Sequence, residues 1–112
     1  MRLDLREEES TCEVVMPNGD TVNVLAPSRA IADSFGQLGK AIICIESEKT
    51  TIEQKEEVLR FLDAKVAEII SRNKENRTYT PEDIRDNLSS KQVLKFLTNY
   101  ADWIRTIIQS KN

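Results

Sequence analysis

The side chains that most often carry enzyme chemistry are sparse in this sequence. The chain of 112 residues contains no histidine, the residue used most often as a general base, a metal ligand and a switch near neutral pH. Cys12 and Cys44 stand far apart, so they form neither a CxxC redox motif nor the paired spacing of a zinc site. We expect both to be reduced structural residues, with a disulfide as the alternative.

Neither the acidic residues nor the glycines form a recognisable catalytic or nucleotide site. The carboxylates lie along the solvated faces of expected helices or in the run Glu7 to Glu9, and no pair is flanked by residues that would build a buried acid–base site. The glycines fit neither of the two patterns that cradle phosphate, GxGxxG and GxxxxGKS/T. We therefore expect a protein that is not an enzyme and that holds no cofactor and no metal.

The charge pattern indicates what the protein does not bind. Sixteen Lys and Arg against 19 Asp and Glu give a net charge of −3, which offers no positive field for nucleic acid or an anionic membrane. The cluster Arg72, Lys74 and Arg77 is diluted by Glu75 and lacks aromatic residues for base stacking. No apolar run approaches the ~20 residues that cross a bilayer, and the first residues do not read as a signal peptide. We expect a cytoplasmic protein that binds neither nucleic acid nor membrane.

The chain has the length of one domain, since domains typically contain ~100–150 residues, and its pattern changes near residue 25. Apolar residues alternate with polar ones over residues 1–25, which indicates β-structure, whereas residues 26–112 show helical spacing. Asn18-Gly19 lies between two alternating runs and supplies the positive φ angles of a tight hairpin turn. Residues 2–6 alternate too and are a candidate third strand. The sequence predicts an α+β fold, with an N-terminal β-hairpin packed on a bundle of about four helices.

Helical spacing and capping residues predict where the four helices lie. A polar stretch over residues 73–78 separates the second from the third and predicts an exposed connection. In chain order the helices begin after Ser28, within residues 50–53, at Pro81 and near Ser90; the second ends near Arg72 and the last near Gln109.

The first helix leaves two interpretations open. Gly36 and Gly39 each weaken a helix by about 1 kcal/mol relative to Ala, so the helix either kinks there or ends. If it ends, residues 41–45 form a strand.

The last predicted helix carries more apolar surface than one helix contact requires. Its apolar positions cover an arc of roughly 180°, whereas a helix that covers a single neighbour needs only about 100°. The helix therefore either wedges between internal elements or offers part of its arc to a partner. Aromatic residues dominate binding hot spots, so we expect partner contacts first on this helix. The second candidate is Phe61, in the long helix that begins within residues 50–53. The candidate partner-binding residues are Phe61, Phe96, Tyr100, Trp103 and Ile107.

The order of these features carries a family resemblance. The features are the hairpin over 13–24, the helix after Ala26-Pro27-Ser28, the stretches 79–84 and 88–94, and the amphipathic terminal helix. This order resembles the tail assembly chaperones of long-tailed bacteriophages and related prophages, which are small acidic proteins that look like a β-hairpin followed by a helical bundle. The resemblance covers nearly the whole chain as a pattern, without a diagnostic motif.

The resemblance implies a non-enzymatic, cytoplasmic factor that coats the long, largely helical tape measure protein while tail tube subunits assemble around it. The tape measure protein is then the expected partner, with the tail tube protein and a second copy of this chain as further partners to consider. The family has no catalytic residues to carry over.

Two alternatives to this function stay open. The first is another small virion assembly or connector component, or a protein interaction adaptor. The second is a DNA-binding regulator in which residues 81–87 and 90–109 form a helix-turn-helix. The exposed side of the last helix mixes Lys91, Lys95 and Arg105 with Asp102, whereas a recognition helix usually clusters positive charge.

Overall fold

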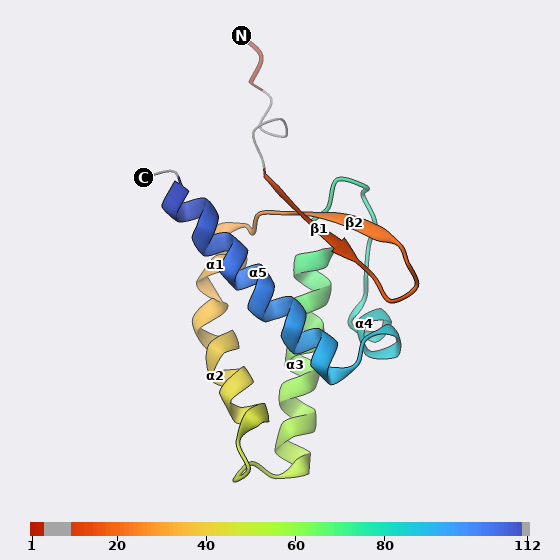
Figure 1. Cartoon of the computed structure of the whole chain (residues 1–112), viewed down its shortest axis with the longest axis vertical. Helices are drawn as coiled ribbons and strands as arrows, with labels where there is room; N and C mark the ends of the chain where they lie inside the picture. Colours follow the sequence, from red (N-terminus) through yellow and green to blue (C-terminus); the bar gives the residue numbers. More distant parts are fainter. Residues whose placement is uncertain (4–9, 111–112) are drawn as a thin grey trace.

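The computed structural model describes residues 1–3 and 10–110 and confirms the α+β class. A β-hairpin lies at one end of the molecule, α2 and α3 run side by side in opposite directions, and α5 crosses in front of them (Figure 1). The elements are β1 (Thr11–Val15), β2 (Thr21–Leu25), α1 (Arg29–Asp33), α2 (Phe35–Glu46), α3 (Ile52–Ile70), α4 (Pro81–Asn87) and α5 (Ser90–Ser110).

The hairpin forms at the predicted turn. β1 and β2 pair antiparallel, with Val14 opposite Val22. The turn closes through a hydrogen bond from Met16 N to the Asp20 carbonyl (2.7 Å) and one from Gly19 N to the Met16 carbonyl (2.8 Å). The candidate third strand over residues 2–6 lies, from residue 4 onward, outside the described part of the chain.

Gly19 is the turn position where a side chain is most costly, because its φ is +94°. Nothing lies within 4 Å of a Cβ added there, so the cost of a substitution comes from the backbone alone. We expect Gly19→Val to lower the free energy of unfolding by about 1–2 kcal/mol, and Gly19→Asn to lower it less, since Asn tolerates positive φ. Thermal unfolding followed by far-UV circular dichroism measures both. Equal losses for Val and Asn would show that turn strain is not the cause.

The first predicted helix is two helices, which corrects the predicted number from about four to five within residues 10–110. The break lies at Ser34 rather than at either glycine. The Ser34 hydroxyl donates to the Ile31 carbonyl at 2.6 Å and competes with the helical ladder. Residues 41–45 belong to α2, so the interpretation of this segment as a strand is wrong.

Side-chain caps begin the helices close to where the sequence predicts them. Ser28 Oγ accepts from Ile31 N at the start of α1, and a reciprocal capping box is present at Thr80. A second reciprocal capping box, of Thr51 and Gln54, begins α3 within the range that the sequence predicts. These caps satisfy N–H groups that have no partner inside their helix.

The core lies around α3, which packs against α2, α4, α5 and β2. The inward-facing valines of β2 and four residues of α3 from Leu62 to Ile70 have no exposed surface, and α5 adds a buried row of its own. The fully or nearly fully buried residues include Val22, Val24, Leu62, Val66, Ile69, Ile70, Ile84, Val93, Leu97 and Tyr100. One expectation is wrong here: Ile52, placed on the apolar side of α3, is 77% exposed at the helix start.

The connection after α3 is not simply an exposed loop, which corrects the sequence prediction. Leu25 N donates to the Arg72 carbonyl (2.8 Å) and Lys74 N donates to the Asn23 carbonyl (3.1 Å), so the connection pairs with the outer edge of β2. Asn73 is buried and donates through Nδ2 to the carbonyls of Ile70 and Arg77. Because residues 72–74 pair with β2 in this way, α3 ends at Ile70, before the predicted end near Arg72.

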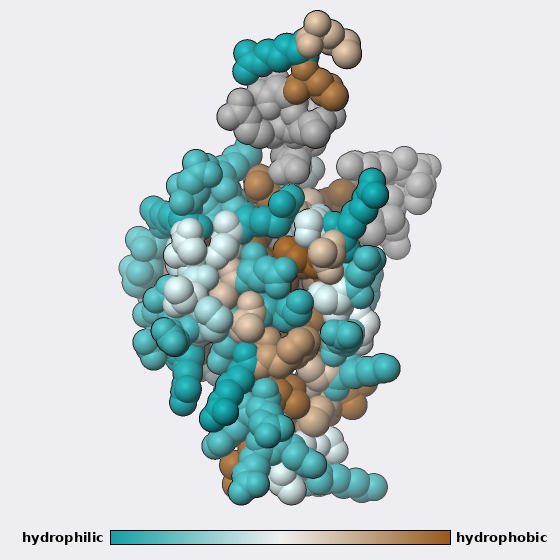
Figure 2. Space-filling view, turned by 180° about the vertical axis from the view of Figure 1, so that it is seen from behind, coloured by the Kyte–Doolittle hydropathy of each residue, from teal (hydrophilic) through white to brown (hydrophobic). Residues whose placement is uncertain are grey.

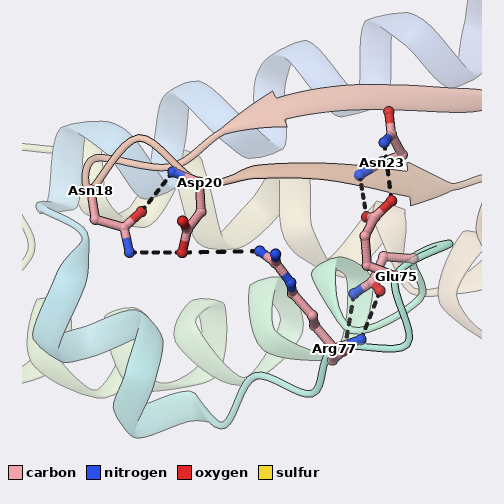
Figure 3. Close-up of polar contacts among 6 residues, drawn as sticks. Asn18, Asp20, Asn23, Glu75 and Arg77 are labelled. Atoms are coloured by element: carbon pink, nitrogen blue, oxygen red, sulfur yellow. Dashed lines mark hydrogen bonds and ion pairs between the residues drawn. The ribbon is translucent and has the colours of Figure 1, made fainter.

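Side-chain hydrogen bonds and an ion pair also join the connection after α3 to the hairpin (Figure 3). Glu75 accepts from the backbone N–H of Asn23 (2.7 Å) and from its side-chain Nδ2 (3.0 Å). Arg77 forms an ion pair of 3.9 Å with Asp20, whose carboxylate also accepts from Asn18. We refer to residues 72–77 as the β2 strap, since they cover the outer edge of β2.

The β2 strap makes stability depend on pH. Hydrogen bonds from the Asn23 side chain and then from its backbone hold the pKa of Glu75 below its ordinary value of 4.5. A carboxyl with a lowered pKa in the folded state stabilises the fold above its unfolded pKa, and that contribution is lost as the pH falls through the folded value. We expect the free energy of unfolding to fall more on acidification below pH 4.5 in the wild type than in Glu75→Gln. Urea titrations from neutral to acidic pH measure this, and equal slopes would contradict it.

Candidate functional site

The aromatic residues of α5 form one cluster around Tyr100. Its ring stacks on Phe96 with centroids 5.6 Å apart, lies 5.6 Å from Trp103 in a tilted pair, and meets Phe35 of α2 edge to face at 6.1 Å. The Tyr100 hydroxyl donates to the Leu25 carbonyl at 2.9 Å. Burial raises the pKa of this phenol, so it stays protonated at neutral pH.

The structure separates the five candidate partner-binding residues. Tyr100 is 1% exposed, contrary to the expectation that its ring offers surface to a partner, because α5 is enclosed by α3 on one side and the end of the hairpin on another. Phe96, Trp103 and Ile107 are half-buried and pack against the core. Phe61 is 36% exposed on α3, where Lys65 Nζ lies 6.0 Å from its ring centroid.

The face of the molecule opposite α5 has no broad apolar surface. Seen from behind, apolar residues form a narrow, interrupted strip between hydrophilic ones (Figure 2). β1 and α5 lie on the opposite side of the molecule, the one that faces the reader in Figure 1.

A groove runs between β1 and α5, which lie alongside each other in opposite directions (Figure 1). Its cavity volume is about 340 Å³, within the size range of ligand pockets. Residues 12–17 form one wall, Ile70 lies at the base, and the other wall contains Leu88, Gln92, Lys95, Phe96, Asn99 and Tyr100. We call this feature the β1–α5 groove.

The β1 wall of the groove is an open strand edge. In an antiparallel pair, N–H and C=O groups point in turn toward the partner strand and away from it. Because Met16 N bonds to Asp20, the groups of Met16, Val14 and Cys12 face β2, whereas those of Val15, Glu13 and Thr11 face away. Within the described residues, no hydrogen bond occupies these outward-facing backbone groups of β1. The corresponding edge of β2 is covered by the β2 strap.

The β1 wall was missed by sequence reasoning, because an open strand edge depends on what the rest of the chain places beside it. Val15 is 65% exposed on the outer face of this strand. Of the five candidate residues, the structure brings Phe96 and Tyr100 to the groove, with Phe96 the more accessible of the two.

The lining of the groove combines apolar side chains with a few charged and polar ones. Its base is apolar, while Glu13 and Lys95 place one charge of each sign at its walls. Burial raises the pKa of the Cys12 thiol, so this cysteine is not an activated nucleophile. Cys12 and Cys44 are both free thiols in this structure.

A second, smaller cavity of about 240 Å³ lies between α3, α4 and the start of α5. Its charged lining residues are Glu56, Arg60, Asp63 and Arg85, which balance in sign. The pKa of Asp63 lies above its ordinary value, because the effect of burial is larger than the opposing effect of the positive charge of Arg85.

Residues 1–3 and 10–110 contain no group of three His, Cys, Asp or Glu side chains placed to hold a metal ion. In the same part of the chain, none of the helices has the length and apolar character needed to span a bilayer.

Comparison with models of protein families, with curated proteins and with solved structures finds no match for this chain.

Proposed function

We propose that this chain is a non-enzymatic protein-binding factor that holds a segment of a longer client protein in the β1–α5 groove. The observation that carries the proposal is the combination of an apolar base with an open strand edge in one groove. Apolar contacts supply affinity in such sites, and unpaired backbone groups supply direction and register.

The order of hairpin and helices supports a more specific proposal, that the protein is a tail assembly chaperone of a phage or prophage. Its client is then the tape measure protein, which it keeps soluble in the cytoplasm of the bacterial host while the tail tube assembles. The net charge of −3 suits this task, since it disfavours adventitious binding to nucleic acid.

The client proposal can be tested by co-expression. The client to use is the product of a very long, helix-coding reading frame immediately downstream of this gene, and the measurement is its soluble fraction with and without this chain. We expect the chain to raise the soluble fraction. Absence of such a frame, or a client that stays insoluble, would overturn the tail assembly proposal.

The role of the groove is tested with a matched pair of variants. Phe96→Ala removes the accessible aromatic residue of the groove, and Phe61→Ala makes the same change on the exposed face of α3. Hot-spot residues typically contribute 2 kcal/mol or more, so we expect Phe96→Ala to weaken client capture by about 30-fold and Phe61→Ala to leave it near the wild-type value. Far-UV circular dichroism checks that both variants are folded. The reverse ranking would place the binding surface on α3.

A further inference from the structure

We infer that the occupant of the β1–α5 groove is an extended client segment that pairs antiparallel with β1 as an added strand. This inference rests on the proposed function and specifies how the client is held. It also specifies the client chemistry: apolar residues at every second position, with a basic residue between them.

The backbone of β1 selects an extended occupant. The outward-facing N–H and C=O groups of Thr11, Glu13 and Val15 have no hydrogen bond within the described residues. A helix has used its own backbone groups internally and cannot pair with a strand edge, whereas an extended segment presents a matching row. Antiparallel pairing is the more stable of the two strand orientations per residue.

The two walls of the groove define the side-chain pattern. Side chains of an added strand alternate between two faces. Those on the inner face continue the row of Cys12, Val14 and Met16, where they meet the apolar side chains of Leu88 and Phe96. Those on the outer face continue the row of Thr11, Glu13 and Val15 and remain exposed. The client segment is therefore apolar at inner positions and polar at outer ones.

The charge of Glu13 decides between occupants. Its exposed carboxylate lies in the middle of β1, and opposite charges stabilise a directly facing cross-strand pair while like charges destabilise it. A lysine or arginine opposite Glu13 is favoured. Pairing of two copies of β1 centred on this residue would set two carboxylates against each other, so we commit to a client segment rather than a second copy.

Backbone-modified peptides test the pairing without altering the protein. The probe is a fluorescent synthetic peptide in which valine alternates with threonine, and one central threonine is replaced by lysine. In the proposed pairing the N–H groups of the threonine and lysine residues point to β1, whereas those of the valines point to solvent. N-methylation of the threonines and lysine is expected to weaken binding to the wild-type chain by about tenfold or more, and N-methylation of the valines to leave it nearly unchanged. Equal effects of the two patterns would overturn the inference.

The strand edge is tested with two variants of one residue. Glu13→Pro removes an outward N–H that the hairpin does not use, and proline is tolerated at edge positions of this kind. We expect it to weaken peptide binding by about tenfold, whereas Glu13→Gln keeps the N–H and loses only the preference for lysine over glutamate at the central peptide position. If Glu13→Pro does not fold, the N-methylated peptides on the wild-type chain decide the matter.

The outcomes separate the inference from the proposed function. In one outcome, the chain solubilises the client and Phe96→Ala abolishes this effect, but the groove binds an amphipathic helical peptide and not the alternating peptide. The proposed function then stands, and only the pairing of the client as an added strand is wrong. If the chain leaves the client insoluble while the alternating peptide binds in the predicted N-methylation pattern, the strand mode stands and the tail assembly role is wrong.

Discussion

Tyr100→Ala is expected to lower the free energy of unfolding by about 3–5 kcal/mol, the usual range for truncation of a buried aromatic residue. The ring is 1% exposed and contacts three other aromatic residues, Phe35, Phe96 and Trp103. Its hydroxyl also joins α5 to the end of β2 through the Leu25 carbonyl. Since small domains are stable by only ~5–15 kcal/mol, this variant should be partly unfolded at moderate temperature. Urea unfolding followed by far-UV circular dichroism measures the change.

Tyr100→Phe is the matched control, because it keeps the ring and removes only the hydroxyl. We expect a loss of about 1 kcal/mol, the ordinary net value of one hydrogen bond. A loss of that size for Tyr100→Ala as well would show that the ring is not enclosed as described, and would return it to the list of accessible partner-binding residues.

Leu62→Ala is expected to lower the free energy of unfolding by about 2–5 kcal/mol. Leu62 lies on the side of α3 that faces the core and has no exposed surface. Because α3 packs against α2, α4, α5 and β2, a cavity at its centre weakens several contacts at once. The measurement is the shift in the urea midpoint at constant slope.

Ile52→Ala provides the control on the same helix. Ile52 is 77% exposed at the start of α3, so its truncation should change stability by less than about 0.5 kcal/mol. Similar losses at both positions would mean that α3 is not packed in this orientation, and the assignment of the core would have to be revised.

The features that could be predicted from sequence are those set by residues close together in the chain. The turn at Asn18-Gly19 and the helix starts at Ser28 and Pro81 each depend on contacts over three or four residues. Local patterns of this kind specify local backbone geometry directly. The class of the fold follows from the change of period near residue 25.

The features that were missed depend on contacts between distant segments. Tyr100 is buried because its hydroxyl reaches Leu25, 75 residues earlier, and its ring reaches Phe35. The apolar arc of α5 is wide for the same reason, since α5 packs on α3 and also reaches the hairpin. A periodicity argument shows how much of a helix is apolar but not which neighbours cover it.

The candidate site likewise combines a feature that could be predicted from sequence with one that depends on distant segments. Phe96 could be found from its position on an amphipathic helix, whereas the opposite wall is the backbone of β1, and backbone groups leave no trace in residue types. Whether a strand edge is open depends on what the rest of the chain places beside it. Here the β2 strap covers one edge, and the pairing of Asn73 and Glu75 with β2 could not be predicted from their polar character.

The two edges of the hairpin differ in how they are protected. Exposed strand edges are templates for pairing with other chains, and unchecked pairing of this kind leads to aggregation. The β2 strap covers the outer edge of β2 with backbone and side-chain hydrogen bonds. Loosening the strap would expose this second edge, so we expect variants that weaken it to aggregate more readily than the wild type.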